Sequence, residues 1–276
     1  MTLSPNPFRF SNVANLMFVD LPGSGFSFTT NVTLLPTDAQ TFGVQLTQAI
    51  NSFIQESELG KSSKLIIGGE GTFIRSLSGL NDIDTLKGMI HFSLWPEMYA
   101  MGRYYGVAGL ELKILGDSER IAIDSTFTSC YNYIRSSKFL EAHQCLDTIY
   151  NFVESKTKNT NLLDVRLLSN ITEFIPMVQY YFSQPSHVTA WKAPNSRLFE
   201  SQSGYIANLT YVDVAKNYTK DISAFTKDYF SVRHWFVAGQ SDFVSYYKGV
   251  RNWLENELSF VESDAFKKAK LDVNIQ

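Results

Sequence analysis

The sequence lacks a long apolar run and a large charge surplus. Two of its most apolar stretches, Leu16–Val19 and Leu65–Ile67, are ended by Asp20 and Gly68, whereas a membrane-spanning helix needs about 20 apolar residues. Lys and Arg total 24 against 27 Asp and Glu, so the formal charge is only -3. Nothing in this balance attracts the chain to phosphate backbones. We expect a protein that is not membrane-spanning and has no nucleic acid partner.

Cysteine is also scarce. The sequence contains two cysteines, Cys130 and Cys145. They are too few for a disulfide framework, although one bond between them is sterically conceivable. We expect free thiols in a reducing compartment. The first residues show neither a signal peptide nor a transit pattern, so no targeting segment is expected. We attribute four Asn-x-Thr sequons to chance in a chain rich in Asn, Ser and Thr; they begin at Asn31, Asn170, Asn208 and Asn217.

What the chain does have is the composition and length of a folded protein. Hydrophobic residues make up 44% of its 276 residues, which predicts one large or two small domains with a sizeable core. In the first hundred residues, apolar strand patterns at 15–20, 64–68 and 86–92 alternate with helical patterns. One helical pattern follows a Thr-x-x-Gln capping box at residues 37–40, and another begins near Phe73. This alternation favours a parallel α/β sheet.

A second kind of pattern occupies residues 105–225, where helical periodicity is rich in Tyr, Asn and Ser. Residues 234–239 read as another buried strand, and residues 246–268 are mostly helical. We therefore predict three segments. They are an N-terminal core part (1–104), a helical insertion lobe (105–225) and a C-terminal core part (226–276).

Several motifs, in order, resemble those of the serine carboxypeptidases. Residues 12–28 are similar to the family's Ala-Asn-Leu-Leu-Phe-Leu-Asp-x-Pro-x-Gly-x-Gly-Phe-Ser-Tyr segment. Residues 66–72 occupy the position at which the family has the motif Ile-Ala-Gly-Glu-Ser-Tyr. Further matches lie at residues 86–90, 145–164, 205–216 and 239–253. The resemblance implies an α/β-hydrolase fold, with a mostly parallel sheet that is incomplete at both ends and a helical insertion lobe.

The same resemblance predicts that the catalytic machinery is lost. The family's nucleophilic serine sits on a strand-to-helix elbow, and Gly71 stands at that position, without a side chain to form an acyl-enzyme. Asp242 stands at the triad aspartate, but no histidine follows it in the sequence. Glu70 matches a glutamate that helps to hold the substrate carboxylate. The oxyanion loop belongs to a segment upstream of residues 15–20, and we expect it to be missing.

Glu70, Gly71 and Asp242 are thus vestigial positions, with Asp242 expected to accept backbone N–H bonds. The four histidines have no metal-ligand spacing, so neither a metal nor a cofactor is expected. These features favour a non-catalytic accessory subunit of a larger protein assembly, possibly with a partner chain that supplies the missing strands. By analogy with other inactive enzyme folds, an intracellular, mitochondrial setting is favoured.

Three alternatives remain open. The chain is also compatible with a soluble module that binds a ligand or peptide near Glu70, and with a hydrolase whose nucleophile has moved. The secretory or vacuolar setting typical of the resembling family is the alternative compartment.

Overall fold

The structure is a computed structural model that describes residues 6–27, 29, 31–158, 160–167, 174–192, 199, 204–260 and 263–268. The chain divides into two compact units. One comprises residues 1–35 and 175–204, and the other residues 36–174 and 205–276. This division cuts through the predicted helical lobe, because residues 175–204 pack with the N-terminal segment.

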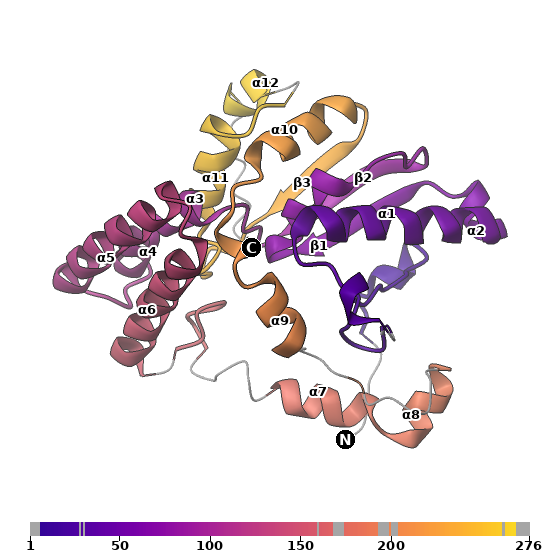
Figure 1. Cartoon of the computed structure of the whole chain (residues 1–276), viewed down its shortest axis with the longest axis horizontal. Coiled ribbons are helices and arrows are strands. Elements are labelled where there is room, and N and C mark those ends of the chain that lie inside the picture. Colours follow the sequence, from indigo (N-terminus) through magenta and orange to yellow (C-terminus); the bar gives the residue numbers. More distant parts are fainter. Residues whose placement is uncertain are drawn as a thin grey trace. The chain divides into compact units, whose positions relative to one another are not determined.

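The larger unit contains a three-stranded parallel sheet (Figure 1). Its strands are β1 (Leu65–Glu70), β2 (Leu86–Phe92) and β3 (Arg233–Val237), in the order β1-β2-β3. Both pairings are parallel, which confirms the predicted parallel α/β architecture and three of the four predicted strands. Among the described residues, β1 and β3 each pair on one side only, so the sheet is incomplete.

One face of this sheet is covered by helical segments. Strand β1 runs directly into η3, a 3₁₀ helix over Gly71–Gly79, and η3 packs against both β1 and the 18-residue helix α1 (Ala39–Glu56). Gly43 of α1 and Gly79 of η3 permit this close approach, since a Cβ on either would overlap the backbone of the other segment. Met89 and His91 of β2 are buried on this face.

The N-terminus of α1 corrects one prediction. The N-cap is Asp38, whose carboxylate accepts a hydrogen bond from the Thr41 backbone N–H at 2.7 Å. The predicted capping box with Thr37 and Gln40 is therefore wrong, although the helix itself is confirmed. An aspartate accepts this bond and also complements the positive end of the helix dipole.

The opposite face of the sheet is open. Because side chains alternate along a strand, the register places Ile66, Ile90 and Trp235 on this face, together with Phe92 and Val237. The exposed fractions are 54% for Ile66, 45% for Trp235 and 48% for Val237. Parallel sheets are normally covered on both faces. We call these five residues the open apolar face.

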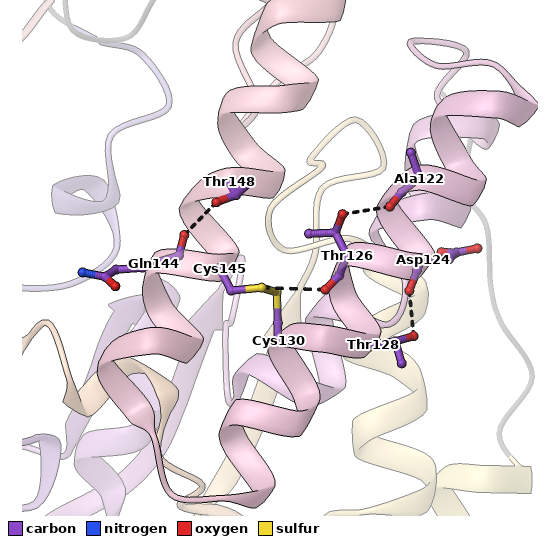
Figure 2. Close-up of a disulfide and its surroundings, with 8 residues drawn as sticks. All are labelled: Ala122, Asp124, Thr126, Thr128, Cys130, Gln144, Cys145 and Thr148. Carbon is purple, nitrogen blue, oxygen red and sulfur yellow. Dashed lines mark hydrogen bonds between the residues drawn. A yellow bond between two sulfur atoms is a disulfide. The ribbon is translucent and has the colours of Figure 1, made fainter.

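Helices α3 (Met98–Gly102), α4 (Tyr105–Glu111), α5 (Asp117–Arg135) and α6 (Phe139–Thr157) follow the second strand. Helices α5 and α6 pack side by side and are joined by a disulfide between Cys130 and Cys145 (Figure 2), with a Cα–Cα separation of 5.4 Å. The expectation of free thiols is therefore wrong. The tight turn between the two helices brings cysteines 15 residues apart into bonding range, which spacing alone did not reveal.

The rest of this unit is helical apart from β3, as the sequence predicts. Helix α2 (Glu58–Ser62) follows α1, and α9 (Gly204–Thr210), η5 (Asp213–Ala215) and α10 (Thr219–Asp228) precede β3. Helices α11 (Tyr247–Asn256) and α12 (Ser263–Lys268) follow it, with Val250, Trp253 and Leu254 of α11 buried in the core. No helix within the described ranges is both long enough and apolar enough to cross a membrane.

The smaller unit carries the main error of the sequence interpretation. Residues 15–20 form no strand, although a buried one was predicted there. Phe18 is 88% exposed, and Asp20 bonds within the following turn, where its carboxylate accepts from the Phe26 N–H and its carbonyl from the Ser27 hydroxyl. A strand needs a neighbour to satisfy its backbone groups, and the described residues provide none for this segment.

Short helices and aromatic rings hold this unit together. It contains the 3₁₀ helices η1 (Phe10–Asn12) and η2 (Val32–Leu34), and the helices α7 (Phe174–Phe182) and α8 (Pro185–Ala190). The Phe182 ring lies 6.3 Å from Phe26 and 4.8 Å from Phe199, measured between centroids. These contacts join residues 6–27 to the α7–α8 segment.

Candidate functional site

The predicted site lies where the parallel strands end. Glu70 is the last residue of β1, and Gly71 begins η3 with φ = +60°. This left-handed backbone is unfavourable for residues with a Cβ, so glycine suits the turn. A Cβ on Gly71 would meet no heavy atom within 4 Å. Gly71 thus forms a tight strand-to-helix turn with open space beside it, and it has no side chain that could act as a nucleophile.

Asp242 lies at the same edge, in the loop after β3. Its side chain is 4% exposed, and Oδ1 accepts a hydrogen bond from the Ser245 backbone N–H at 2.8 Å. Burial raises the pKa of Asp242 to about 6, with the Glu70 charge adding to the rise and a hydrogen bond from Ser93 opposing it. The structure therefore brings Glu70, Gly71 and Asp242, the three positions that the resemblance singled out, into one neighbourhood.

An aromatic network lies beside Asp242. The Trp95 backbone N–H donates to the Gly71 carbonyl at 2.9 Å, and its indole N–H donates to the Tyr105 hydroxyl at 3.1 Å. That hydroxyl lies 2.7 Å from the hydroxyl of Tyr150, and the Tyr105 ring stacks on Phe243. Burial raises the pKa of Tyr105 to about 12.

Ser93 was missed by the sequence analysis. It follows β2 with φ = +43°, its N–H donates to the Val237 carbonyl at 2.7 Å, and its hydroxyl bonds to Asp242. A serine with a left-handed backbone is uncommon and points to local strain. No sequence pattern signals such a conformation, because the surrounding strands impose it.

None of the four histidines serves as a base for Asp242 in the described parts of the chain. His91 and His234 stack on each other, with His91 Nε2 3.1 Å from His234 Nδ1. Both lie on the covered face of the sheet, where burial lowers the pKa of His91 to about 3 and that of His234 to about 4. The rings of His143 and His187 bond to the carbonyls of Tyr211 and Tyr181.

The arrangement offers two carboxylates and one serine hydroxyl, but no activated nucleophile at the elbow. Nucleophilic catalysis by serine needs a base within hydrogen-bonding reach. The described residues also contain no group of three or more His, Cys, Asp or Glu side chains placed to hold a metal ion.

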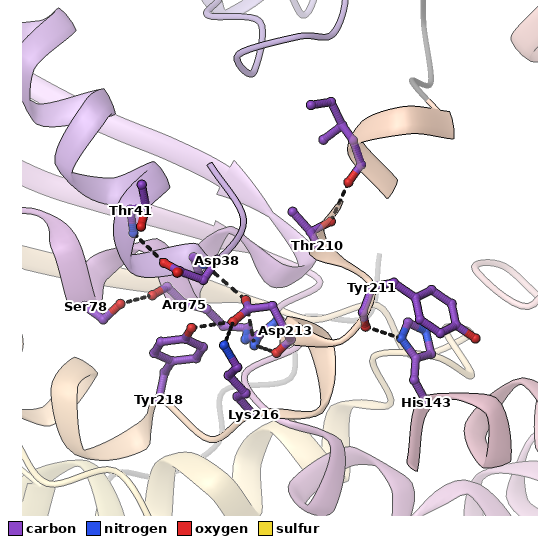
Figure 3. A network of polar contacts seen from close by, with 12 residues as sticks. Asp38, Thr41, Arg75, Ser78, His143, Thr210, Tyr211, Asp213, Lys216 and Tyr218 are labelled. Atoms are coloured by element: carbon purple, nitrogen blue, oxygen red, sulfur yellow. Dashed lines mark hydrogen bonds and ion pairs between the residues drawn. The ribbon is translucent and has the colours of Figure 1, made fainter. Parts of the chain in front are cut away.

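A buried ion pair holds η3, the helix that begins at Gly71, against η5 (Figure 3). Arg75 of η3 is 2% exposed and Asp213 of η5 is 4% exposed, and Arg75 Nη2 lies 3.1 Å from Asp213 Oδ2. Asp213 also accepts hydrogen bonds from the Ala39 N–H at 3.1 Å and the Tyr218 hydroxyl at 2.5 Å. This carboxylate therefore ties η3, α1 and α10 together. The sequence singled out neither residue as important.

The comparisons with known proteins concern the sequence of residues 1–74 and the overall fold. The family model for serine carboxypeptidase matches residues 1–74, which include the elbow. The fold is similar to that of Kex1Δp, a prohormone-processing carboxypeptidase from Saccharomyces cerevisiae, with a TM-score of 0.69 and 16% sequence identity. The similarity covers 87% of this chain but only 59% of the Kex1Δp chain. No curated protein sequence matches the chain.

Proposed function

We propose that this serine carboxypeptidase-like chain is a non-catalytic accessory subunit of a larger protein assembly, and that it depends on a partner polypeptide for its stable fold. The observation that supports the subunit role is the open apolar face of the sheet. The elbow supports the absence of catalysis, because Gly71 has the backbone of a nucleophile elbow and no side chain.

The open apolar face has the chemistry of an interface. Trp235 lies over Gly88 of the neighbouring strand, since a Cβ on Gly88 would come within 2.6 Å of the indole ring. Phe92 lies over Gly68 in the same way, at 3.8 Å. The centre of this face is therefore aromatic and aliphatic, and the same register places the charged Arg233 and Glu70 at its two ends. Burial of the apolar part would contribute roughly 25 cal/mol per Å². An amphipathic helix is the element that usually covers this face of a parallel sheet.

The free edge of β1 supports the same proposal. The family resemblance implies that another strand lies next to β1. Unpaired backbone groups that become buried cost about 1–3 kcal/mol each. We propose that a partner polypeptide adds a parallel strand here and a helix over the open apolar face.

The compartment is part of the proposal. Of the two settings weighed from the sequence, the mitochondrial one rested on analogy. The disulfide between Cys130 and Cys145 favours the secretory or vacuolar one, because such bonds persist in oxidising compartments. Mass spectrometry of the native protein after alkylation without reductant tests this. Unmodified cysteines in a disulfide-linked peptide support it, and alkylated thiols return the reducing compartment to favour.

The subunit role is tested with the isolated chain and two matched variants. We expect the isolated chain to bind a hydrophobic dye such as ANS and to self-associate at low concentration. Trp235→Ser should reduce dye binding several-fold, whereas Phe230→Ser should change it little. Phe230 is 75% exposed but lies outside the open apolar face. A monodisperse monomer that unfolds cooperatively and binds no dye would contradict the proposal.

A second candidate rests on the hydrogen bond between Ser93 and Asp242. A hydrolase with a moved nucleophile would use this hydroxyl, and a peptide-binding module would use Glu70 and Asp242. Labelling by a fluorophosphonate that Ser93→Ala abolishes would favour the hydrolase. Saturable binding of a peptide that Glu70→Gln weakens would favour the module. The subunit proposal predicts neither result.

A further inference from the structure

Three described sequon asparagines are exposed, and they differ in local geometry. Asn31, Asn208 and Asn217 all lie on the surface, while Asn170 lies outside the described residues. We infer that Asn31 and Asn217 are N-glycosylation sites and that Asn208 is not. The inference goes beyond the subunit role, and it rests on the secretory setting proposed above.

Asn31 lies in an exposed turn, the kind of surface segment in which a modified sequon is found. Its Oδ1 accepts a hydrogen bond from the Thr33 N–H at 3.1 Å and another from the Thr33 hydroxyl at 2.7 Å. The asparagine and threonine side chains of the sequon are thus in direct contact. Asn31 Nδ2, the atom that would carry the sugar, makes no hydrogen bond within the described residues. It is therefore accessible to a transferase and, afterwards, compatible with an attached glycan.

Asn217 forms the same kind of turn just before α10. Its Oδ1 accepts a hydrogen bond from the Thr219 N–H at 2.8 Å. The Thr219 hydroxyl accepts a hydrogen bond from the Trp253 indole N–H at 3.0 Å, but its own proton remains available to a second acceptor. Asn217 is exposed although Tyr218 next to it is buried. A glycan on Asn217 would therefore extend into solvent without disturbing the core.

Asn208 differs because it lies inside a helix. Residues two apart on a helix do not face each other, and the Thr210 hydroxyl donates to the Ile206 carbonyl at 3.0 Å. The threonine therefore cannot reach the Asn208 amide unless α9 unwinds. This contrast makes Asn208 a natural internal control for the two turn sequons.

The disulfide favours a compartment where this modification occurs. Structural disulfides persist in the oxidising secretory pathway, and Asn-x-Thr glycosylation marks surface segments of secreted proteins. The donor is a lipid-linked oligosaccharide diphosphate. A bond forms between Asn Nδ2 and the anomeric carbon, and the bond from that carbon to the diphosphate oxygen breaks. The amide nitrogen loses one proton, the lipid diphosphate leaves, and no oxidant is needed.

The test measures glycan occupancy on the native protein. Peptide-N-glycosidase converts each glycosylated Asn to Asp, so digestion in heavy-oxygen water labels occupied sites for peptide mass spectrometry. We expect labelled peptides that contain Asn31 and Asn217 and an unlabelled peptide that contains Asn208. Unlabelled Asn31 and Asn217 would overturn the inference. Labelling of Asn208 at equal occupancy would overturn the geometric argument.

Variants expressed in a eukaryotic secretory pathway give a second readout. Asn31→Gln and Asn217→Gln should each remove one glycan-sized step in electrophoretic mobility, and Asn208→Gln should remove none. Thr33→Ala should remove the same step as Asn31→Gln, while Thr33→Ser retains it because the hydroxyl remains. Loss of the step in Thr33→Ser, or its retention in Thr33→Ala, would contradict the role of the Asn31–Thr33 contact.

Discussion

At the scale of single residues, Gly71 stands where the resemblance places a nucleophilic serine, and its backbone is left-handed. We predict that Gly71→Ser has no peptidase activity, because no histidine lies beside Asp242 in the described chain to accept the hydroxyl proton. The left-handed backbone at φ = +60° should cost roughly 1–2 kcal/mol of stability in both Gly71→Ser and Gly71→Ala. The measurements are turnover of a carboxyl-terminal peptide substrate and denaturant unfolding. Activity in the serine variant above the alanine variant would contradict this account.

Asp213 provides the sharpest stability test, because it is the buried partner of Arg75. Asp213→Ala would leave a 2% exposed guanidinium without its main counter-charge, and removal of one partner of a buried pair typically costs about 3–5 kcal/mol. Lys216 also lies near Asp213 but is 41% exposed, so Lys216→Ala should cost no more than about 0.5 kcal/mol. Urea unfolding compares the two. Equal losses would show that the buried geometry does not matter.

At the scale of elements, a buried carboxyl links the start of α3 to the end of α11. Glu97 precedes α3 and shares a hydrogen bond with Glu257, which is also paired with Arg103. Burial, with the Glu257 contact adding to it, raises the pKa of Glu97 to about 8. The folded protein therefore holds a proton there that the unfolded chain releases at its ordinary pKa near 4.5.

The sign of the pH dependence follows from this difference. Above the unfolded pKa, the folded state binds more protons, so stability decreases as the pH rises through the folded pKa. We predict a loss of roughly 1–2 kcal/mol between pH 6.5 and pH 8.5. His91 and His234 stay neutral over this range because their pKa values are lowered. Glu97→Gln should flatten the dependence in urea unfolding, and an unchanged slope would assign it elsewhere.

A comparison of the predicted and observed strands shows which parts of the fold the local sequence predicts. Strands β1, β2 and β3 were predictable because short apolar runs bounded by turn residues retain their pattern wherever they are placed. Residues 15–20 have the same pattern and form no strand, because pairing is a tertiary property. The disulfide likewise depends on how α5 and α6 pack. The roles of Ser93 and Glu97 depend on a strained backbone and on burial, neither of which has a sequence pattern.

The residues of the candidate site also fall into two groups, those that the sequence located and those that only the fold brings together. The resemblance located Glu70, Gly71 and Asp242, which lie close together in the fold at the carboxyl edge of the sheet. It did not indicate the Ser93 contact, the tyrosines beside Asp242, or the Arg75–Asp213 pair. These groups come from segments 12 or more residues apart, and their proximity is set by the sheet register and by α4, α6 and η5.

At the scale of the whole molecule, the incomplete sheet predicts an uneven pattern of amide hydrogen exchange. Strand β2 is paired on both sides, whereas β1 and β3 each have one free edge among the described residues. In a parallel pair, alternate residues point their backbone groups to opposite sides. Alternate amides of β1 and β3 should therefore exchange rapidly in the isolated chain, while the β2 amides are the most protected.

The partner proposal predicts which of these amides become protected from hydrogen exchange in the native assembly. In the native assembly, the fast amides of β1 should become protected if a strand is added there, and β2 should change little because its pairings already exist. Trp235→Ser should weaken this protection if a helix covers the open apolar face, whereas Phe230→Ser should leave it unchanged. Amide hydrogen exchange, measured by mass spectrometry on the isolated chain and on the native assembly, tests whether a partner strand pairs with β1. If the β1 amides of the isolated chain are already protected at low concentration, the sheet closes without a partner and the accessory role loses its physical basis.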